Sequence, residues 1–405
     1  MKIAIIGGGI GGLTTALMLH QRGLRCEVYE AVPDVKEIGV GITLLPHAMR
    51  ELAALGLQDA LERDGIENLE SVFYNNFGQF IYKEPRGRHA GYDVPELGMH
   101  RGKLHRILYD AAKERLGADK IHTGYRASRV EQTGDQVTVH FDAVAGNPAP
   151  APVKADLVLA CDGVNSSIRR QFYPDESVAF AGINTWRGVT RHAPILTGKS
   201  YIRIGSIETG KLVVYPIIDG NGEQLINWTA EIRQPGKSMN DWNKTGKLED
   251  FLPIYEDWKF DWLDVPTLMK NSDVIFEYPM VDKDPIDRWT FGRTTFLGDA
   301  AHPMYPRGSN GSAQAILDAK CITDILARPD TPNRVEAALQ EYEDIRRPAT
   351  ANVVLTNRSV PPDFIIMKVD ELSGGKPFDN IDDLISQEEL REISDNYKKV
   401  AGFSK

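Results

Sequence analysis

The sequence predicts an α/β fold in which a parallel sheet covered by helices is interleaved with an antiparallel sheet. Residues 3–6 (IAII) are a short continuous apolar run, which is typical of a parallel strand buried on both faces. Apolar positions at helical spacing follow in residues 13–20, and residues 25–30 form a second strand, so the chain opens with a βαβ unit. From about residue 181 to 280 the strands alternate between apolar and polar residues, which predicts an antiparallel sheet.

The first nineteen residues also have the composition of an export signal or a membrane anchor, because a lysine precedes a run of small and apolar residues. Five glycines between positions 7 and 12 argue against both interpretations, since each costs about 0.8–1 kcal/mol relative to alanine in a helix interior. The run continues into His20-Gln21-Arg22 without a small-residue cleavage pattern. We therefore expect this segment to stay in the mature protein.

A glycine motif, Gly7-x-Gly9-x-x-Gly12, follows the first strand directly. Such glycines allow a tight turn, a close approach of a pyrophosphate to the backbone, and close packing of helix on strand. Glu30 ends the second strand, where a ribose hydroxyl would need an acceptor, and Asp34 is a weaker candidate for that role. Together these features predict a Rossmann-like site for an adenine dinucleotide.

Composition narrows the classes of function. The 405 residues carry a formal net charge of −10 without a basic tract, which excludes nucleic acid and anionic membranes as expected partners. The three cysteines are far apart and form no CxxC pair, so neither a disulfide framework nor a metal site is predicted. No segment later in the chain reaches eighteen apolar residues, so we expect no membrane span and a cytoplasmic protein.

Proline and glycine positions and apolar periodicity predict the remaining elements. Helices are expected over residues 46–57 and 100–117, from about 311, and in a polar C-terminal segment broken at Pro361-Pro362; strands are expected over 71–82, 127–142 and 152–160. The resulting division is a nucleotide-binding domain in three parts (1–70, 98–180 and 285–350), a substrate domain in two parts (71–97 and 181–284), and a C-terminal helical tail (351–405).

Two further turns follow predicted parallel strands. The strand that ends ACD is followed by Gly163, and the strand TTFL ends in Gly298-Asp299. Ligands of open parallel sheets lie beyond the carboxyl ends of the strands, so Asp162, Asp299 and the first glycine turn should face the same space. An Asp-Gly pair alone is usually a plain turn. Three such loops at one sheet edge predict the site of one long cofactor.

The glycine motif, the DG turn and the GD turn, in that order and at these spacings, resemble the three fingerprints of the single-component flavoprotein aromatic hydroxylases. The resemblance covers roughly residues 1–350 and leaves the segment after about 355 outside it. It implies an FAD-binding domain interleaved with a substrate domain. Within the family, residues 181–190, 278–285 and 298–311 look like members that act on phenazine carboxylates.

The resemblance also implies roles for individual residues. The glycine turn would approach the FAD pyrophosphate, Glu30 the ribose, Arg101 the phosphate region and Asp299 the ribityl chain, and Asp162 would serve both FAD and the nicotinamide cofactor. The helix that begins near residue 310 would point its N-terminus at the flavin, where its dipole favours an anionic reduced flavin. The cofactor-binding residues implied are Gly7, Gly9, Ile10, Gly11, Gly12, Glu30, Val40, Gly41, Arg101, Asp162, Asp299, Asn310 and Gly311.

The activity implied is hydroxylation of an electron-rich aromatic or heteroaromatic ring, with NADH or NADPH and O2 as co-substrates and a flavin C4a-hydroperoxide as the oxygen donor. The substrate chamber must exclude water, so apolar and aromatic residues are expected there. The candidates are Trp186, Arg187, Tyr215, Trp228, Met304, Tyr305 and Pro306. Each aromatic candidate could instead be plain core. Arg187 could hold a substrate carboxylate, which would allow hydroxylation with loss of CO2, or lie on the surface.

No residue is identified as a catalytic acid or base, and we expect His302 to belong to the GD turn rather than to transfer a proton. A reductase or oxidase on the same FAD scaffold remains an alternative function. A halogenase is disfavoured because no tryptophan begins a Trp-x-Trp-x-x-Ile segment, and an NAD-only protein would leave the two aspartate turns unexplained. The expected partners are a small aromatic substrate and O2, for a monomer or homodimer.

Overall fold

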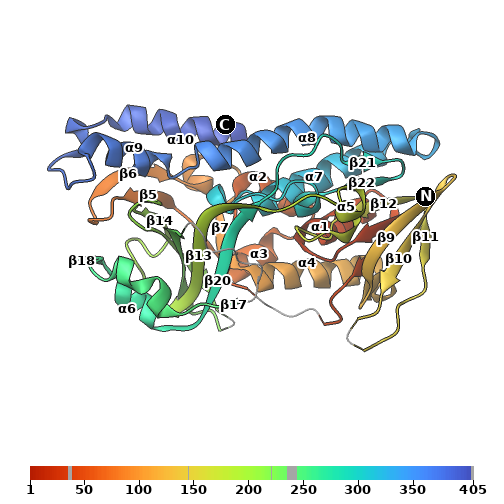
Figure 1. Ribbon diagram of the computed structural model, residues 1–405, viewed down its shortest axis with the longest axis horizontal. Helices are drawn as coiled ribbons and strands as arrows, with labels where there is room; N and C mark the ends of the chain where they lie inside the picture. Colours follow the sequence, from red (N-terminus) through yellow and green to blue (C-terminus); the bar gives the residue numbers. More distant parts are fainter. Residues whose placement is uncertain (35–38, 145, 220, 235–243, 403–405) are drawn as a thin grey trace.

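The computed structural model describes residues 1–34, 39–144, 146–219, 221–234 and 244–402 of the chain. Figure 1 shows two regions side by side, one that holds the N-terminus and one that holds residues 200–218 and 244–275, with the C-terminal helices running along a long edge of both. Residues 235–243 of the expected substrate domain and 403–405 of the expected tail lie outside the described residues.

The first region is built on a six-stranded sheet in the order β21-β22-β12-β1-β2-β8, parallel except for the edge strand β21. Its strands are β1 (Lys2–Ile6), β2 (Arg25–Glu30), β8 (Ile121–Thr123), β12 (Leu157–Ala160), β21 (Thr290–Phe291) and β22 (Thr294–Phe296). Strand β1 is buried after its first residue, as an apolar run in the middle of a parallel sheet should be. This sheet confirms the predicted parallel fold.

Helices cover this sheet. They are α1 (Ile10–Gln21), α2 (Pro46–Ala54), α3 (Gln58–Asp64), α4 (Arg101–Leu116), α5 (Ser167–Phe172) and α7 (Gly311–Leu326). Two smaller sheets flank them, β11-β10-β9 (Val153–Ala155, Gln136–Asp142, Arg126–Thr133) and β3-β7-β4 (Gly41–Leu44, Leu97–His100, Gly65–Glu67). Proline at the first position of α2 fits the predicted helix start, because the missing N–H would be unpaired there in any case.

The second region contains an eight-stranded sheet in the order β17-β20-β13-β16-β15-β14-β5-β6, in which all pairs are antiparallel except β14 with β5. Its strands are β5 (Glu70–Tyr74), β6 (Phe80–Pro85), β13 (Ala179–Arg191), β14 (Ser200–Ile204), β15 (Lys211–Ile218), β16 (Gln224–Arg233), β17 (Lys244–Thr245) and β20 (Ser272–Asp282). A short hairpin, β18 (Lys259–Phe260) with β19 (Leu263–Asp264), and helix α6 (Val265–Lys270) complete the region.

Each of the three expected strand segments is divided into two strands: 127–142 forms β9 and β10, and 152–160 forms β11 and β12. Residues 71–82 form two strands, β5 and β6, rather than one, and a turn at Asn75 to Gln79 separates them. Asn75 makes this turn because its side chain accepts hydrogen bonds from the backbone N–H of Phe77 and Gln79. The Asn-Asn-Phe-Gly segment therefore indicates a turn. The alternating pattern of the aromatic residues around it had suggested one continuous strand.

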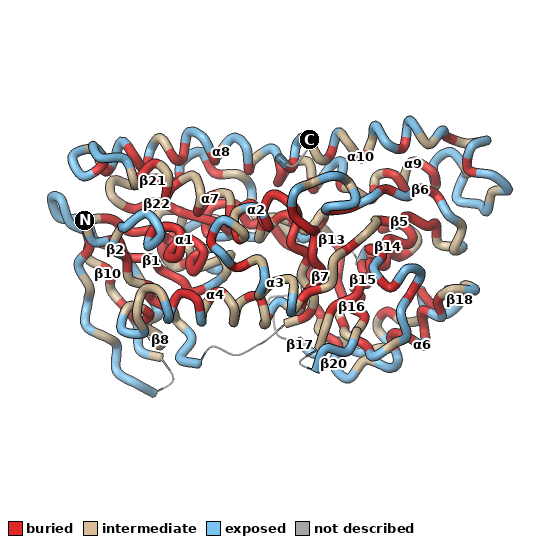
Figure 2. Tube along the Cα trace, turned by 180° about the vertical axis from the view of Figure 1, so that it is seen from behind, coloured by how far each residue is buried: buried red, intermediate tan, exposed pale blue. Residues whose placement is uncertain are grey.

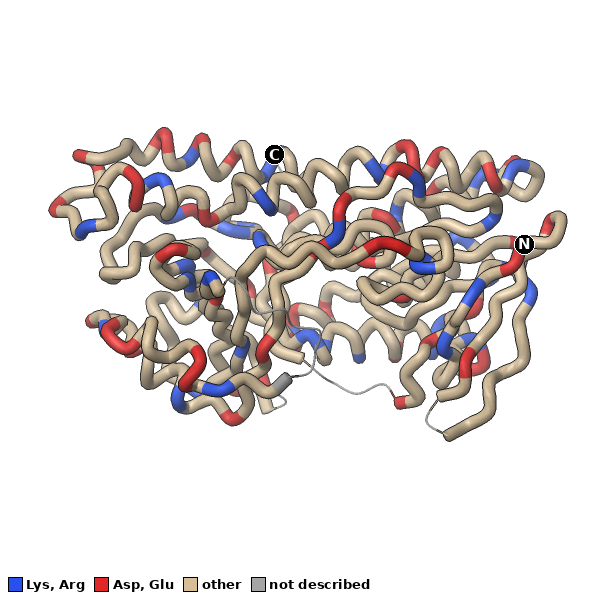
Figure 3. Tube along the Cα trace, in the orientation of Figure 1, with Lys and Arg blue, Asp and Glu red and all other residues tan. Residues whose placement is uncertain are grey.

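The C-terminal helices are α8 (Val335–Ser359), α9 (Phe364–Ser373) and α10 (Gln387–Ala401). Helix α8 ends before Pro361-Pro362, as predicted, but it runs through the boundary expected at residue 350 without a break. Figure 2 shows that α8 and α10 bury the turns that face the rest of the molecule and expose the outer ones. Acidic and basic residues are interspersed along both helices in Figure 3. None of the helices that the structure describes has the length and apolar character needed to cross a bilayer.

Candidate functional site

The glycine turn after β1 has two kinds of glycine. Gly7 has a positive φ of 103°, and a Cβ there would lie 2.3 Å from the Cys161 carbonyl oxygen. A Cβ on Gly12 would lie 2.0 Å from the carbonyl oxygen of Gly7. A Cβ on Gly9, at the N-terminus of α1, would meet no protein atom within 4 Å. Packing of the protein itself thus requires Gly7 and Gly12, whereas the space beside Gly9 is open to a ligand.

Glu30 and Asp162 face one cavity of about 490 Å³ at the carboxyl ends of β1, β2 and β12. Glu30 is held in place because its two carboxylate oxygens accept hydrogen bonds from the backbone N–H of Gly8 (2.6 Å) and Val32 (2.8 Å). Asp34, the weaker candidate for the ribose, is exposed and does not line this cavity.

Asp162 lies just before helix α5, and its Oδ2 accepts a hydrogen bond from the backbone N–H of Ser167 at 3.0 Å. Its other oxygen, Oδ1, is buried and has no hydrogen-bond partner among the described residues. Burial raises the pKa of this carboxyl. A buried, unpaired oxygen beside a cavity is an acceptor available to a ligand donor.

A second cavity of about 390 Å³ continues from the first, and the two share Gly9, Cys161 and Gly163 in their walls. Burial raises the pKa of the Cys161 thiol, so this cysteine is a neutral side chain at the junction. The predicted residues Ile10, Gly11, Gly41 and Arg101 also line the second cavity. Gly12 and Val40 support the walls from behind, since neither lines a cavity and Val40 accepts the backbone N–H of Arg101 at 2.9 Å.

Asp299, Asn310 and Gly311 lie together in the wall of the second cavity, where the strand β22 and helix α7 approach each other. The Asp299 side chain is accessible from the cavity although protein atoms surround it, and this enclosure raises the pKa of its carboxyl. Asn310 is fully buried, and its Oδ1 has no hydrogen-bond partner among the described residues. The N-terminus of the sixteen-residue helix α7 therefore faces the cavity, beside one carboxyl and one unpaired amide oxygen.

His302 belongs to the support of this turn. Its Nε2 lies 2.5 Å from Oδ2 of Asp318, which also accepts the backbone N–H of Gly298 at 3.0 Å, and Arg346 from α8 contacts the other oxygen at 2.7 Å. Burial would raise the pKa of Asp318, but His302 and Arg346 outweigh it and lower this pKa to about 2. The expectation that His302 is part of the turn agrees with this geometry.

One face of the antiparallel sheet forms the far wall of the second cavity. Arg187, Tyr215, Met304 and Pro306 line it, as expected. Arg187 lies over the ring of Tyr278 at 5.5 Å, and its Nε has no hydrogen-bond partner among the described residues. A half-buried guanidinium that has an unpaired N–H donor and lies in a cavity wall can bind a carboxylate.

The structure does not bring Trp186 and Trp228 to the cavity. Both are fully buried on the opposite face of the sheet, where Trp186 stacks on Phe251 at 5.1 Å and Trp228 Nε1 donates to Ser272 Oγ at 2.8 Å. The reason is the two-residue period of a strand, because Arg187 and Thr229 face the cavity and their neighbours must face away. The prediction that these tryptophans contact substrate was wrong.

Tyr305 also points away from the cavity. It packs with Ile183, Ile207 and Met280, and its hydroxyl is hydrogen-bonded to Asp282. Burial beside Asp282 raises the pKa of Tyr305 to about 12. Met304 and Pro306, on either side of it, do line the cavity, so the substrate role predicted for Tyr305 was also wrong.

Several wall residues were missed in the sequence. Tyr201 lines the cavity and stacks on Tyr215 with ring centres 5.1 Å apart. Asn227 supports the wall from behind, because its side chain accepts the backbone N–H of Gly41 at 2.7 Å. Side chains alternate between the two faces of β14 and β16, so one residue known to face the cavity would have predicted which others share that face. Thr43, Val213, Thr229, Glu231, Leu297, Ser309, Ser312 and Ala315 also line the cavity.

Glu231 ends the wall with a buried ion cluster. Lys211 Nζ lies 3.0 Å from a Glu231 oxygen and 3.3 Å from Asp363, at the start of α9. All three side chains are almost inaccessible to solvent. Burial would raise the pKa of Asp363, but Lys211 and Arg307 hold it below its usual value. The cluster joins the sheet to the C-terminal segment.

These observations fit the two-ended cofactor that the resemblance implies. The two cavities form one long cleft, and the backbone at Gly9 is open to a phosphate. Asp162 and Asn310 each have a buried oxygen without a hydrogen-bond partner among the described residues, so each can accept a hydrogen bond from a ligand. Glu30 and Asp162 would hold the adenosine half, and Asp299 and the N-terminus of α7 would hold the flavin half.

Comparisons with known proteins agree. A family model described as "FAD binding domain" matches residues 1–223 and 274–357. The chain is 41% identical over 364 residues to the phenazine 1,6-dicarboxylic acid hydroxylase PhzS of Lysobacter antibioticus, covering 88% of this chain and 89% of that protein. It is 31% identical to the 3-amino-4-hydroxybenzoate 2-monooxygenase of Streptomyces cremeus, covering 90% and 88%.

Two further proteins extend this picture. The 6-hydroxynicotinate 3-monooxygenase of Bordetella bronchiseptica is 28% identical, over 87% of this chain and 89% of that protein. Among solved structures, Klebsiella pneumoniae HpxO complexed with FAD and uric acid matches with a TM-score of 0.76 at 24% identity, over 100% of this chain and 95% of the other. At that identity the likeness shows a shared fold.

Proposed function

This chain belongs to the FAD-binding domain family and is a flavin-dependent aromatic monooxygenase that uses NAD(P)H, and we propose that its substrate is a heteroaromatic or aromatic ring bearing a carboxylate. The observation that carries the proposal is Arg187, whose Nε–H has no hydrogen-bond partner among the described residues and lies in the cavity wall that also holds Tyr201 and Tyr215. The names of the three relatives above each contain an aromatic carboxylic acid.

The substrate chamber is the sheet side of the second cavity. Tyr201 and Tyr215 supply a stacked aromatic wall, and Val213, Met304 and Pro306 supply apolar surface. A flat ring can pack against such a wall while Arg187 binds its carboxylate at one end. We assign the sheet wall of this chamber to a substrate domain made of residues 71–97 and 181–284, whereas Met304 and Pro306 come from the part of the FAD-binding domain expected at 285–350.

The cleft residues outside the substrate chamber would hold the cofactor FAD. When bound, FAD would supply the redox chemistry, in which NAD(P)H and O2 are consumed and one oxygen atom is added to the ring while the other leaves as water. The glycine turn, Glu30 and Asp162 would bind its adenosine half, and Asp299 with the N-terminus of α7 would orient its flavin half. The dipole of α7 favours negative charge at this end of the cleft.

A panel of substrates tests the proposal. Purified protein with FAD, NAD(P)H and O2 is given phenazine carboxylates, aminohydroxybenzoates and hydroxynicotinates, each beside the analogue that lacks the carboxylate. We expect a carboxylate-bearing ring to accelerate NAD(P)H oxidation, and its product to gain one oxygen. Gain of one oxygen with loss of CO2 would identify hydroxylation at the carboxyl-bearing carbon.

The Arg187→Met variant tests whether Arg187 binds the substrate carboxylate. Arg191→Met is its control. Loss of a charge-assisted hydrogen bond of about 1.5–3 kcal/mol should raise KM roughly 10- to 150-fold for the acid. The analogue without a carboxylate should be unaffected, as should Arg191→Met, which removes an exposed arginine paired with Asp219. Equal effects on acid and analogue would contradict the assignment of Arg187. Substrate-independent NAD(P)H oxidation without oxygen insertion would favour the reductase or oxidase alternative.

A further inference from the structure

Helix α10, which lies beyond residue 357, where the match to the family model ends, packs against the flavin half of the cleft. It starts with a capping box in which Ser386 and Glu389 exchange hydrogen bonds, and its buried side chains are Leu390, Ser394, Tyr397 and Ala401. Gln314 of α7 donates a hydrogen bond to the Ala401 carbonyl oxygen at 3.0 Å. The inner face of α10 thus meets the beginning of α7, whose N-terminus faces the cleft.

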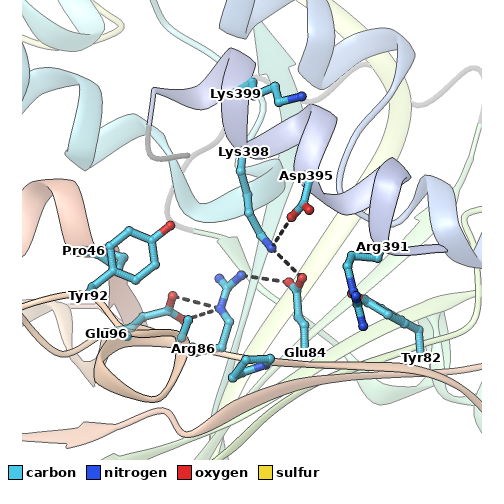
Figure 4. A pocket seen from close by; sticks show the side chains of 13 residues that line it. Pro46, Tyr82, Glu84, Arg86, Tyr92, Glu96, Arg391, Asp395, Lys398 and Lys399 are labelled. Carbon is cyan, nitrogen blue, oxygen red and sulfur yellow. Dashed lines mark hydrogen bonds and ion pairs between the residues drawn. The ribbon is translucent and has the colours of Figure 1, made fainter. Parts of the chain in front are cut away.

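A chain of ion pairs fixes α10 on the edge of the antiparallel sheet, as Figure 4 shows. Arg86 contacts Glu96 at 2.9 Å and Glu84 at 3.2 Å, and Glu84 contacts Lys398 of α10 at 2.7 Å. Ser394 also donates to Glu84, at 2.6 Å. Burial would raise the pKa of Glu84, but Arg86 and Lys398 outweigh it and lower this pKa. Glu84 therefore stays charged, and the helix stays docked.

Tyr397 is the next buried residue along this face after Ser394. Its hydroxyl accepts a hydrogen bond from Asn310 Nδ2 at 2.9 Å and donates one to Asn357 Oδ1 at 3.0 Å. Asn357 Nδ2 in turn donates to the Tyr305 carbonyl oxygen at 3.3 Å. The donors and acceptors run in one direction, so the network sets the orientation of the Asn310 amide.

The loop before α7 has a shape that depends on this contact. Gly308 and Ser309 both have positive φ values, 72° and 57°, and for serine this conformation is strained. A Cβ on Gly308 would lie 1.9 Å from the Tyr397 hydroxyl oxygen, so the tyrosine packs directly on the glycine backbone. Met304, Pro306 and Ser309 of the same loop line the cavity.

Asn310 connects this network to the cleft. Its Nδ2 is used by Tyr397, while its Oδ1 is buried, has no partner among the described residues, and belongs to a residue of the cavity wall. An amide oxygen in that state can accept an N–H from a bound ligand, and a buried acceptor left without a donor costs free energy.

We propose that Tyr397 is a positioning residue for the flavin half of the cleft, acting through Asn310 to hold the loop 305–310 and the N-terminus of α7 in the shape that binds FAD. The inference rests on the proposed function only in that the cleft binds FAD. It gives the C-terminal helix a role in cofactor binding that the glycine and aspartate turns do not supply.

Tyr397→Phe removes the hydroxyl and keeps the ring. Tyr173→Phe is the control, since it removes a tyrosine hydroxyl that donates to the Arg288 carbonyl oxygen away from the cleft. Apo protein is titrated with FAD by flavin fluorescence, and the absorption spectrum and reduction potential of the bound flavin are recorded. We expect Tyr397→Phe to raise the Kd for FAD roughly 2- to 10-fold and to shift the spectrum, with the Tyr173→Phe values equal to wild type.

A double-mutant cycle separates positioning from general stability. In an Asn310→Ala background Tyr397→Phe should have no further effect on the Kd, because the residue it acts through is gone. An unchanged Kd and spectrum in Tyr397→Phe, or an equal effect in both backgrounds, would overturn the inference. If Tyr397→Phe does not fold, Asn310→Ala alone decides, with weaker FAD binding at an unchanged apo-protein Tm as the supporting result and unchanged binding as the contradicting one. A wild-type chain that binds no FAD would overturn the proposed function as well.

Discussion

The two ends of the cleft are built in different ways. At the adenosine end, short strand-to-helix turns supply the wall, and each turn carries its functional residue within a few positions of a buried strand. At the substrate end the wall combines one face of a sheet, the loop before α7, and support from residues more than 80 positions away along the chain, such as Tyr397. The first end is specified locally and the second by packing of the whole molecule.

The Gly298-Asp299 turn, which Asp318 and His302 support, should show the largest effect. Asp318→Asn leaves His302 and Arg346 without their shared carboxylate in the core, so we expect a loss of about 3–5 kcal/mol in the free energy of unfolding. The folded-state pKa of Asp318 is about 2, below its usual 3.8. Its contribution is therefore complete above about pH 4 and lost as pH falls towards 2. Urea unfolding at a series of pH values from 7 down to 2 measures this loss of stability.

In the Asp318→Asn variant that acid-dependent part of the unfolding free energy should be missing. A variant whose stability falls with pH as steeply as wild type would show that Asp318 is not the group responsible.

The glycine turn offers the next largest effect and the sharpest internal comparison. Gly12→Ala places a methyl group 2.0 Å from a backbone oxygen, so we expect about 3 kcal/mol of destabilisation. Gly9→Ala meets no protein atom and should leave the apo-protein Tm unchanged while weakening FAD binding. Differential scanning fluorimetry with and without FAD measures both. If Gly9→Ala binds FAD as tightly as wild type, the FAD phosphate does not lie beside Gly9.

Asp299→Ala should weaken FAD retention by about 1.5–3 kcal/mol, because a ribityl hydroxyl loses its carboxyl partner. The apo protein should not lose stability, since enclosure raises the pKa of this carboxyl and makes its charge costly. Flavin absorbance after gel filtration reports the bound fraction. Wild-type flavin content in the variant would contradict the assignment of Asp299.

The smallest effect is expected at Tyr305. Tyr305→Phe removes a hydrogen bond to Asp282, an acid already paired with Arg358, so a loss of about 1 kcal/mol in stability is expected. The KM for substrate should not change, since the side chain faces away from the cavity. If the variant has a higher KM and an unchanged stability, the Tyr305 side chain contacts the substrate after all.

Most of the fold, and the convergence of the glycine turn, Glu30 and Asp162 on one cavity, could be predicted from the sequence because they depend on local signals. The spacing of Gly7, Gly9 and Gly12, the acid at position 30, and the two aspartate turns each lie next to a buried strand. The substrate end could be predicted only in part. Arg187 and Trp186 are adjacent, and nothing in a single sequence shows which of two neighbours in a strand faces the ligand.

Contacts between residues that are far apart in the sequence could not be predicted from it. Nothing around Tyr397 marks it as a partner of Asn310, and nothing around Lys211 marks it as a partner of Asp363. Such pairs are created when separate elements pack, so only the structure brings them together.

The junction between the two cavities has a consequence for the durability of the enzyme. Oxidants attack cysteine through its thiolate form. Cys161 stands in the wall beside the path of the cofactor, and burial keeps its pKa far above neutral, as it does for Cys26 and Cys321. All three remain neutral thiols, which react slowly with oxidants, so the cleft does not expose a reactive cysteine at this junction.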